Sequence, residues 1–146
     1  MRNTESSKET GKSILQEYRK FIRQVDIRDV RVVAARMDVI DRDYYPSSSL
    51  VSWTVDAEYE PTGDGFNVLH RYRVRVRNKG SKQDKARISV TFLVTYTSKI
   101  AVNDELFDVF RERNLPINTW PYFREFVHNS LMRMGWPPFI APVFRR

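Results

Sequence analysis

The sequence predicts an α+β fold: a four-stranded antiparallel sheet with an N-terminal helix and two C-terminal helices packed on one face. Three observations lead to this prediction. Apolar residues recur at helical spacing near the N-terminus, four segments in the middle of the chain have strand patterns, and the helical period returns after residue 100. Strands in succession, followed by helices, are typical of sheets with their helices on one side.

The first predicted element is a helix over residues 14–23, which carries an apolar stripe and has Ser13 as a suitable N-cap. Residues 1–12 are too poor in apolar side chains to pack, so we expect a disordered polar tail there. We see no internal repeat and no composition shift that would mark a second domain. Residues 13–146 are therefore expected to form a single domain.

Four strands follow. Residues 25–40 are rich in β-branched side chains, and both of their alternating registers are largely apolar, so we expect this strand to be covered on both faces. Residues 50–60 and 66–78 alternate between apolar and polar side chains on either side of a Pro- and Gly-containing turn at 61–65. Residues 86–97 alternate in the same way and form the fourth predicted strand.

Two helices complete the prediction. Asn103 or Asp104 can cap a short helix that ends near residue 113, before Pro116. Trp120-Pro121 then places a proline in the first turn of a longer helix, and Gly135 is suited to end it. The longer helix has one stripe of mainly apolar residues: Phe123, Phe126, Val127, Ser130, Leu131 and Met134.

The composition excludes several classes of protein. The chain has no cysteine, so it has no disulfide, no cysteine-ligated metal and no cysteine nucleophile. His70 and His128 lie on different elements without a third metal ligand at a suitable spacing, and no catalytic motif is present. We therefore expect no enzyme activity, no metal and no cofactor. The polar N-terminus does not resemble a secretory signal, and no apolar run approaches the roughly 18 residues that span a membrane, so we expect a cytoplasmic protein without membrane insertion.

The 146 residues carry a net charge of +7, which is typical of domains that contact nucleic acid or another anionic surface. This charge is unevenly placed along the chain. Residues 43–65 carry five acidic groups and no basic one, whereas residues 66–87 carry eight basic groups and one acidic group. An acidic strand is therefore followed directly by a basic one.

The basic strand has arginines at alternate positions, on one face and about 7 Å apart: Arg71, Arg73, Arg75 and Arg77. Such a row can follow a phosphate backbone, so a nucleic-acid-binding module is the alternative function. The row can also face an acidic protein partner. A third interpretation is that Asp56, Glu58 and Glu60 lie opposite or diagonal to Arg71, Arg73 and Arg75 as cross-strand ion pairs. We favour the ion pairs, so nucleic acid is not the partner we expect.

The C-terminal region resembles the SecB family of protein-export chaperones. The similar residues are Trp120-Pro121-Tyr122-Phe123-Arg124-Glu125, then Met134-Gly135-Trp136-Pro137-Pro138-Phe139 and Ala141-Pro142-Val143. The segment at 25–31 is also similar to the first strand of SecB-like chaperones associated with toxin–antitoxin systems. The resemblance extends over residues 14–143.

This resemblance implies an ATP-independent holdase that assembles as a homotetramer, a dimer of dimers, and binds non-native polypeptides in exposed apolar grooves. Its clients would be secretory preproteins or an antitoxin. The matching residues Pro121, Tyr122, Arg124 and Glu125 would have a structural role, as a fixed helix start and a polar network. Family members that deliver clients to SecA are strongly acidic, so we do not expect this basic chain to dock on SecA by the usual surface.

The groove itself is expected where large aromatic side chains lie at the ends of elements, next to prolines. By this criterion we expect the lining to be Tyr44, Tyr45, Trp120, Trp136 and Phe139, with Trp53 as a further candidate.

Overall fold

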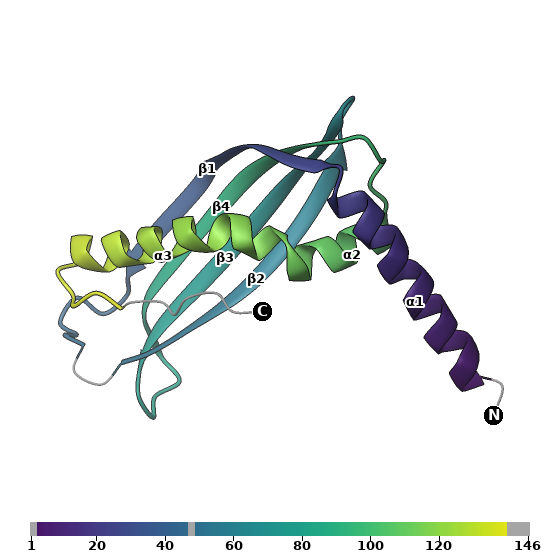
Figure 1. Cartoon of the computed structure of the whole chain (residues 1–146). Helices are drawn as coiled ribbons and strands as arrows, with labels where there is room; N and C mark the ends of the chain where they lie inside the picture. The colour runs from purple at the N-terminus through teal and green to yellow at the C-terminus, as the bar shows by residue number, and fades with distance from the viewer. Residues whose placement is uncertain (1–2, 47–48, 140–146) are drawn as a thin grey trace.

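The structure, a computed structural model, describes residues 3–46 and 49–139. Three helices and four strands make up this part of the chain, in the order helix, four strands, two helices (Figure 1). They are α1 (Asn3–Ile22), β1 (Val25–Val39), β2 (Ser49–Pro61), β3 (Gly65–Asn78), β4 (Asp84–Ser98), α2 (Asp104–Arg113) and α3 (Leu115–Arg133). The predicted fold class is confirmed.

The four strands form one sheet in the order β1-β4-β3-β2, and all neighbours are antiparallel. β1 and β2 are therefore the two edges of the sheet that the described residues form, and among those residues no further strand pairs with the outer side of either one. In Figure 1, α3 lies across one face of the sheet with α2 in line before it, while α1 projects away from the sheet.

The core lies between the helices and the two central strands. The inward residues of β3 and β4 are almost completely buried, as the alternating pattern predicts. The Tyr72 and Phe123 rings stack with centroids 4.2 Å apart, which fixes α3 on β3. Phe21 joins α1 to the same core by stacking on Phe66.

The prediction for the N-terminus differs from the structure. α1 begins at Asn3, so residues 3–12 are helical where a disordered tail was expected, and Ser13 lies inside the helix rather than at its cap. Residues 5–12 include Glu and Lys and contain no proline, so the helix can extend upstream of the apolar stripe. Tyr18 and Phe21 still anchor the packed end of α1, as the spacing of apolar residues predicts.

The prediction that β1 is covered on both faces is wrong. β1 is an edge strand, and most of its side chains are exposed, including Ile27, Val32, Val33 and Met37. An apolar pattern in both registers fits burial, but it equally fits an edge strand whose apolar side chains stay exposed in a single chain.

The start of the long helix is also corrected. α3 begins at Leu115, with Pro116 in its first turn, so Pro121 lies inside the helix instead of starting it. The cap of α2 is as predicted: the side-chain oxygen of Asn103 accepts a hydrogen bond from the Leu106 N–H at 2.8 Å. The apolar stripe of α3 is confirmed, since Phe123, Val127 and Leu131 are buried.

The end of α3 follows the sequence prediction closely. Gly135 has φ +75°, which a residue without Cβ adopts at little cost. The Gly135 N–H donates to Met132 O and the Trp136 N–H to Leu131 O, both at 3.0 Å. This is the Schellman arrangement, and it directs residues 136–139 back toward the sheet. None of the described helices is long and apolar enough to cross a membrane.

Candidate functional site

A strip of apolar residues runs along β2 on the side that faces the helices. It consists of Val51, Trp53, Val55, Ala57 and Tyr59, which we call the β2 strip. Each of these residues pairs with an inward-facing residue of β3, so all five share the helix side of the sheet. The helices do not fully cover the strip, since Val55 is 47% exposed and the other four are partly exposed.

One end of the β2 strip meets residues 136–139, which return from the end of α3. The Trp53 and Phe139 ring centroids are 6.4 Å apart, and Trp136 contacts Tyr44 edge to face at 5.7 Å. A pocket of about 180 Å³ opens here. Its lining is Pro46, Ser49, Val51, Val76, Leu131, Trp136, Pro137, Pro138 and Phe139.

The other end of the β2 strip meets α2. The Tyr59 ring lies 4.5 Å from that of Phe107, and its hydroxyl donates to the Asp104 carboxylate at 2.5 Å. This hydrogen bond raises the pKa of Tyr59 to about 12, so the phenol remains a neutral donor. A hollow of about 420 Å³ lies here, between Ala57, Glu58 and the exposed side of α2. We call the β2 strip, together with the hollow at each of its ends, the candidate groove; the strip alone is roughly 26 Å long at the usual rise per residue.

The structure brings five of the six predicted groove residues to one end of this groove. Trp53 and Phe139 are half-buried and line it, and Tyr44 supports it by packing on Trp136. Trp120 and Trp136 are only 8% and 7% exposed, so they belong mainly to the core, although Trp136 also forms a wall of the pocket.

Tyr45 differs from the other five residues. It is 65% exposed, and no ring contact joins it to the described aromatic residues. The hydroxyl of its neighbour Tyr44 is within hydrogen-bond distance of Ser49 Oγ and donates to Asn78 Oδ1. The two adjacent tyrosines therefore have different environments, one attached to the groove and one in solvent.

Sequence reasoning missed the middle and far end of the groove. The alternation of residues 50–60 predicts an apolar face that includes Val55 but gives no sign that this face stays open, and nothing in the sequence indicates the contact between Tyr59 and Phe107. The alternation of residues 50–60 correctly identified which residues share a face. It contains no information on which strand lies at the edge of the sheet.

The motif residues do not start the helix as predicted, and the described residues show only part of the contacts that a polar network would need. Pro121 lies within α3, and Tyr122 is exposed, with its ring 6.3 Å from Phe92. Glu125 accepts a hydrogen bond from Asn129 one turn later, and Arg124 Nε has no hydrogen-bond partner among the described residues. The similar stretch at 141–143 lies outside the described residues.

The arginine row lies on the other face of the sheet and is only partly paired as predicted. Asp56 lies 3.4 Å from Arg71 and 3.5 Å from Arg73, so the cross-strand pairing is confirmed for this carboxylate. Register places Glu58 opposite Leu69 and Glu60 opposite Asn67.

Of the remaining two arginines, Arg75 departs from the predicted pairing with β2, and Arg77 was not part of it. Arg75 binds Asp84, at the start of β4, at 2.8 Å. Arg77 lies opposite Leu50, and its Nε has no hydrogen-bond partner within the described ranges. Within residues 3–46 and 49–139, the histidines and carboxylates form no group of three that could hold a metal ion.

No protein-family model matches the chain, and no curated protein matches its sequence. Among solved structures, the chain is similar to the SecB-like chaperone Rv1957 of Mycobacterium tuberculosis, in complex with a ChAD peptide from the antitoxin HigA1. The TM-score is 0.75 and the identity 18%, over 86% of this chain and 94% of the other. The chain therefore has the SecB-like fold.

Proposed function

We propose that this protein is an ATP-independent holdase chaperone that binds extended segments of non-native polypeptides in the groove along β2. The observation that carries the proposal is the β2 strip, a row of partly exposed apolar side chains on an edge strand. An unfolded chain exposes apolar side chains and unpaired backbone groups, and both find partners at such an edge.

The groove suits a client without fixed sequence. Trp53, Val55 and Phe139 offer apolar surface that does not select among apolar side chains. The outer edge of β2, which has no partner among the described strands, can add an extended segment by main-chain hydrogen bonds, which every residue except proline can make. Binding the unfolded form in preference to the folded form lowers the concentration of free unfolded chain and therefore slows aggregation.

The proposed clients are an antitoxin or secretory preproteins. The SecB-like fold and the antitoxin peptide bound to the protein of similar structure support the first of these. We propose a cytoplasmic location for this activity, and we do not propose docking on SecA through an acidic sheet face, because arginines dominate that face near β3 and β4.

We further propose that the chain assembles as a homotetramer and that β1 contributes to the contact. The exposed apolar residues Ile27, Val32, Met37 and Val39 share the helix side of this second edge strand, opposite inward residues of β4. Exposed apolar side chains on an unpaired edge are otherwise a site of uncontrolled pairing. Association through β1 would cover them and leave the β2 groove open.

The direct test is suppression of aggregation. A denatured enzyme that aggregates on dilution is mixed with the protein in buffer without ATP, and light scattering is followed. The proposal predicts less scattering as the protein concentration approaches that of the client. Undiminished scattering at a several-fold excess of protein would refute the proposed function.

A further inference from the structure

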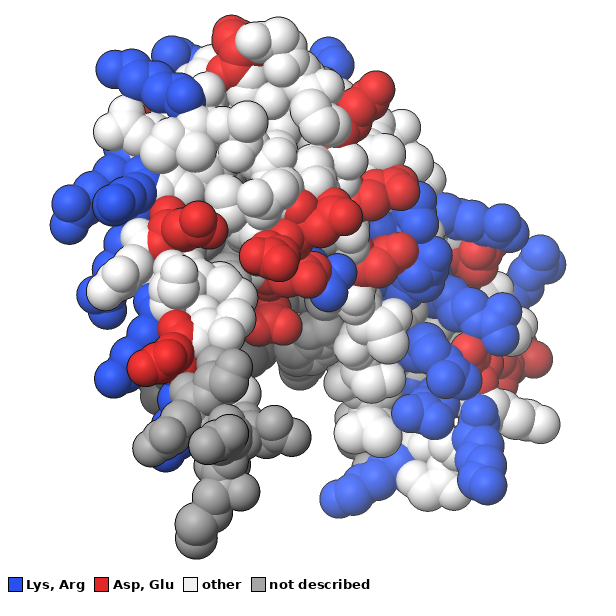
Figure 2. Space-filling model, turned by 90° about the vertical axis from the view of Figure 1, so that its right-hand side faces the viewer, with Lys and Arg blue, Asp and Glu red and all other residues white. Residues whose placement is uncertain are grey.

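The face of the sheet that points away from the helices has a charge pattern of its own. Figure 2 shows blue side chains gathered on the right, the side of the sheet opposite the helices, with fewer red ones between them. Two rows of residues cross this face. One is Asp38, Arg87, Arg75 and Ser52, and the next is Arg36, Ser89, Arg73 and Thr54. Basic side chains from three strands therefore meet on one surface.

These rows surround a hollow of about 460 Å³, which we call the arginine hollow. Its charged lining is Arg36, Arg73, Arg75 and Arg87, with Asp38 as the acidic member. The small polar side chains Ser52, Thr54 and Ser89 leave space between the arginines. The side chains of Arg36 and Arg73 are 77% and 53% exposed, so these two guanidinium groups are accessible to a ligand.

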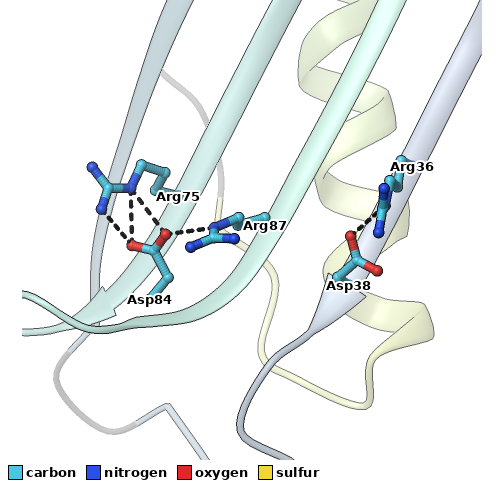
Figure 3. A network of polar contacts seen from close by, with 5 residues as sticks. All are labelled: Arg36, Asp38, Arg75, Asp84 and Arg87. Carbon is cyan, nitrogen blue, oxygen red and sulfur yellow. Dashed lines mark hydrogen bonds and ion pairs between the residues drawn. The ribbon is translucent and has the colours of Figure 1, made fainter.

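One nearly buried carboxylate holds two of the arginines in place. Arg75 and Arg87 lie directly opposite each other on β3 and β4, where like charges repel. Asp84, whose side chain is 3% exposed, lies between them and accepts from Arg87 Nε at 2.7 Å and from Arg75 Nε at 2.9 Å (Figure 3). Burial alone would raise the pKa of Asp84, but these hydrogen bonds from both arginines lower it below its ordinary value. The pair of guanidinium groups is therefore pre-positioned and keeps an excess of positive charge.

The local charges do not cancel. Asp38 binds Arg36, Asp56 is shared by Arg71 and Arg73, and Asp84 is shared by Arg75 and Arg87. Three carboxylates therefore face five arginines. Glu58 and Glu60 share this face farther along β2, beside Leu69 and Asn67. The surface is thus basic around the arginine hollow and acidic at the far end of β2.

The chemistry of this face favours carboxylates over nucleic acid. Single-stranded nucleic acids need aromatic side chains on which bases stack, yet all aromatic residues of the described strands lie on the helix side of the sheet. In contrast, the arginines here already bind carboxylates through Nε and terminal nitrogens, which is the geometry that a glutamate or aspartate side chain would repeat.

We propose that the arginine hollow binds an acidic polypeptide segment, with glutamate or aspartate carboxylates entering between Arg36, Arg73 and Arg87. Arg36 and Arg73 are two strands apart, about 10 Å, and alternate side chains of an extended peptide are about 7 Å apart, so neighbouring acidic side chains can reach both. The hollow lies on the opposite face from the β2 groove. An acidic segment and a non-native client can therefore bind at the same time, and this proposal does not depend on the proposed function.

The test uses a fluorescein-labelled peptide of about ten glutamates, long enough to cross the face, and fluorescence anisotropy on the full chain. The variant Arg36→Gln/Arg73→Gln removes the two lining arginines that do not bind Asp84, and it leaves the ion pairs of Arg75 and Arg87 with Asp84 intact. Its matched control is Arg19→Gln/Arg23→Gln, which makes the same change in net charge at exposed residues of α1 and the turn after it. Thr54→Glu, which places a carboxylate beside Arg73, is a second variant that fills the hollow.

We expect the glutamate peptide to bind, and to bind more weakly as salt rises from about 50 mM to 300 mM. Arg36→Gln/Arg73→Gln and Thr54→Glu should each raise the Kd about tenfold or more, which corresponds to a loss of about 1.4 kcal/mol or more. The control variant should raise the Kd less than about twofold. An equal loss in the control, or no binding at low salt, would overturn the proposal. It would also be overturned if an oligonucleotide of matched length bound more tightly than the peptide and lost its binding in Arg36→Gln/Arg73→Gln.

Discussion

The rings of Trp53 and Phe139 lie with their centroids 6.4 Å apart, one on the edge strand β2 and the other on the segment that follows α3. Both side chains are partly exposed, so the contact does not seal the core. It instead extends the apolar surface of β2 outward. The groove is therefore a product of the fold, because these residues lie far apart in the sequence.

The buried side chain of His70 should make the stability of the protein depend on pH. His70 is buried, with Nδ1 2.9 Å from Thr119 Oγ1, and burial lowers its pKa from 6.5 to about 4. Between these values the unfolded chain takes up a proton that the folded protein does not. The free energy of unfolding therefore includes a contribution from neutral His70 that is complete above pH 6.5. This contribution falls by about 3 kcal/mol in all as the pH is lowered toward 4.

Urea unfolding at a series of pH values measures this effect. His70→Gln should remove most of the fall between pH 6.5 and 4, whatever its effect on stability at pH 7. An unchanged slope in the variant would show that His70 is not the group responsible.

Two neighbouring glycines, Gly63 in the turn between β2 and β3 and Gly65 at the start of β3, should respond differently to substitution. A Cβ atom on Gly65 would lie 2.0 Å from the Tyr96 carbonyl oxygen, whereas one on Gly63 would have no atom within 4 Å. Gly65→Ala should therefore lower the free energy of unfolding by about 2 kcal/mol or more, and Gly63→Ala should change it by less than about 0.5 kcal/mol. Equal unfolding midpoints for the two variants would contradict the close approach of β3 and β4 at this point.

The third prediction concerns assembly. Val32→Asp/Met37→Asp places two charges on the exposed apolar side of β1, opposite Phe92 and Ile88 in register. If β1 contributes to the contact between chains, this variant should have a smaller mass by light scattering at equal protein concentration. Val55→Asp, on the other edge strand, should keep the mass of the unmodified protein. A variant of β1 that retains the full mass would exclude β1 from the contact.

Much of the fold follows from the sequence because the period of apolar residues is a local signal. Strands β3 and β4 each bury one face and β2 partly covers one, so the alternation of apolar residues predicts both the extent and the orientation of these strands. The signal failed at β1, where apolar residues in both registers suggested double coverage. It also failed at Pro121, since the sequence offers two prolines suited to a first helical turn and only Pro116 occupies one.

The site was less predictable, because it depends on what covers each residue. Trp120 and Trp136 stand beside prolines at the ends of predicted elements, yet packing against the sheet buries them. Val55 has no unusual sequence context, and it is exposed because β2 lies at the edge of the sheet. The Arg75–Asp84–Arg87 cluster was missed because its acid comes from β4 and not from the acidic segment.

The most direct test of the account is client binding by two variants of one strand. Val55 and Leu50 are 47% and 49% exposed on β2, but Val55 lies in the groove and Leu50 on the opposite face. Affinity for a permanently unfolded polypeptide should fall about tenfold in Val55→Asp, because a bound apolar segment would strip water from the new carboxylate. Leu50→Asp should bind like the unmodified protein. Equal affinities in both variants, or a loss confined to Leu50→Asp, would contradict a polypeptide-binding groove along β2.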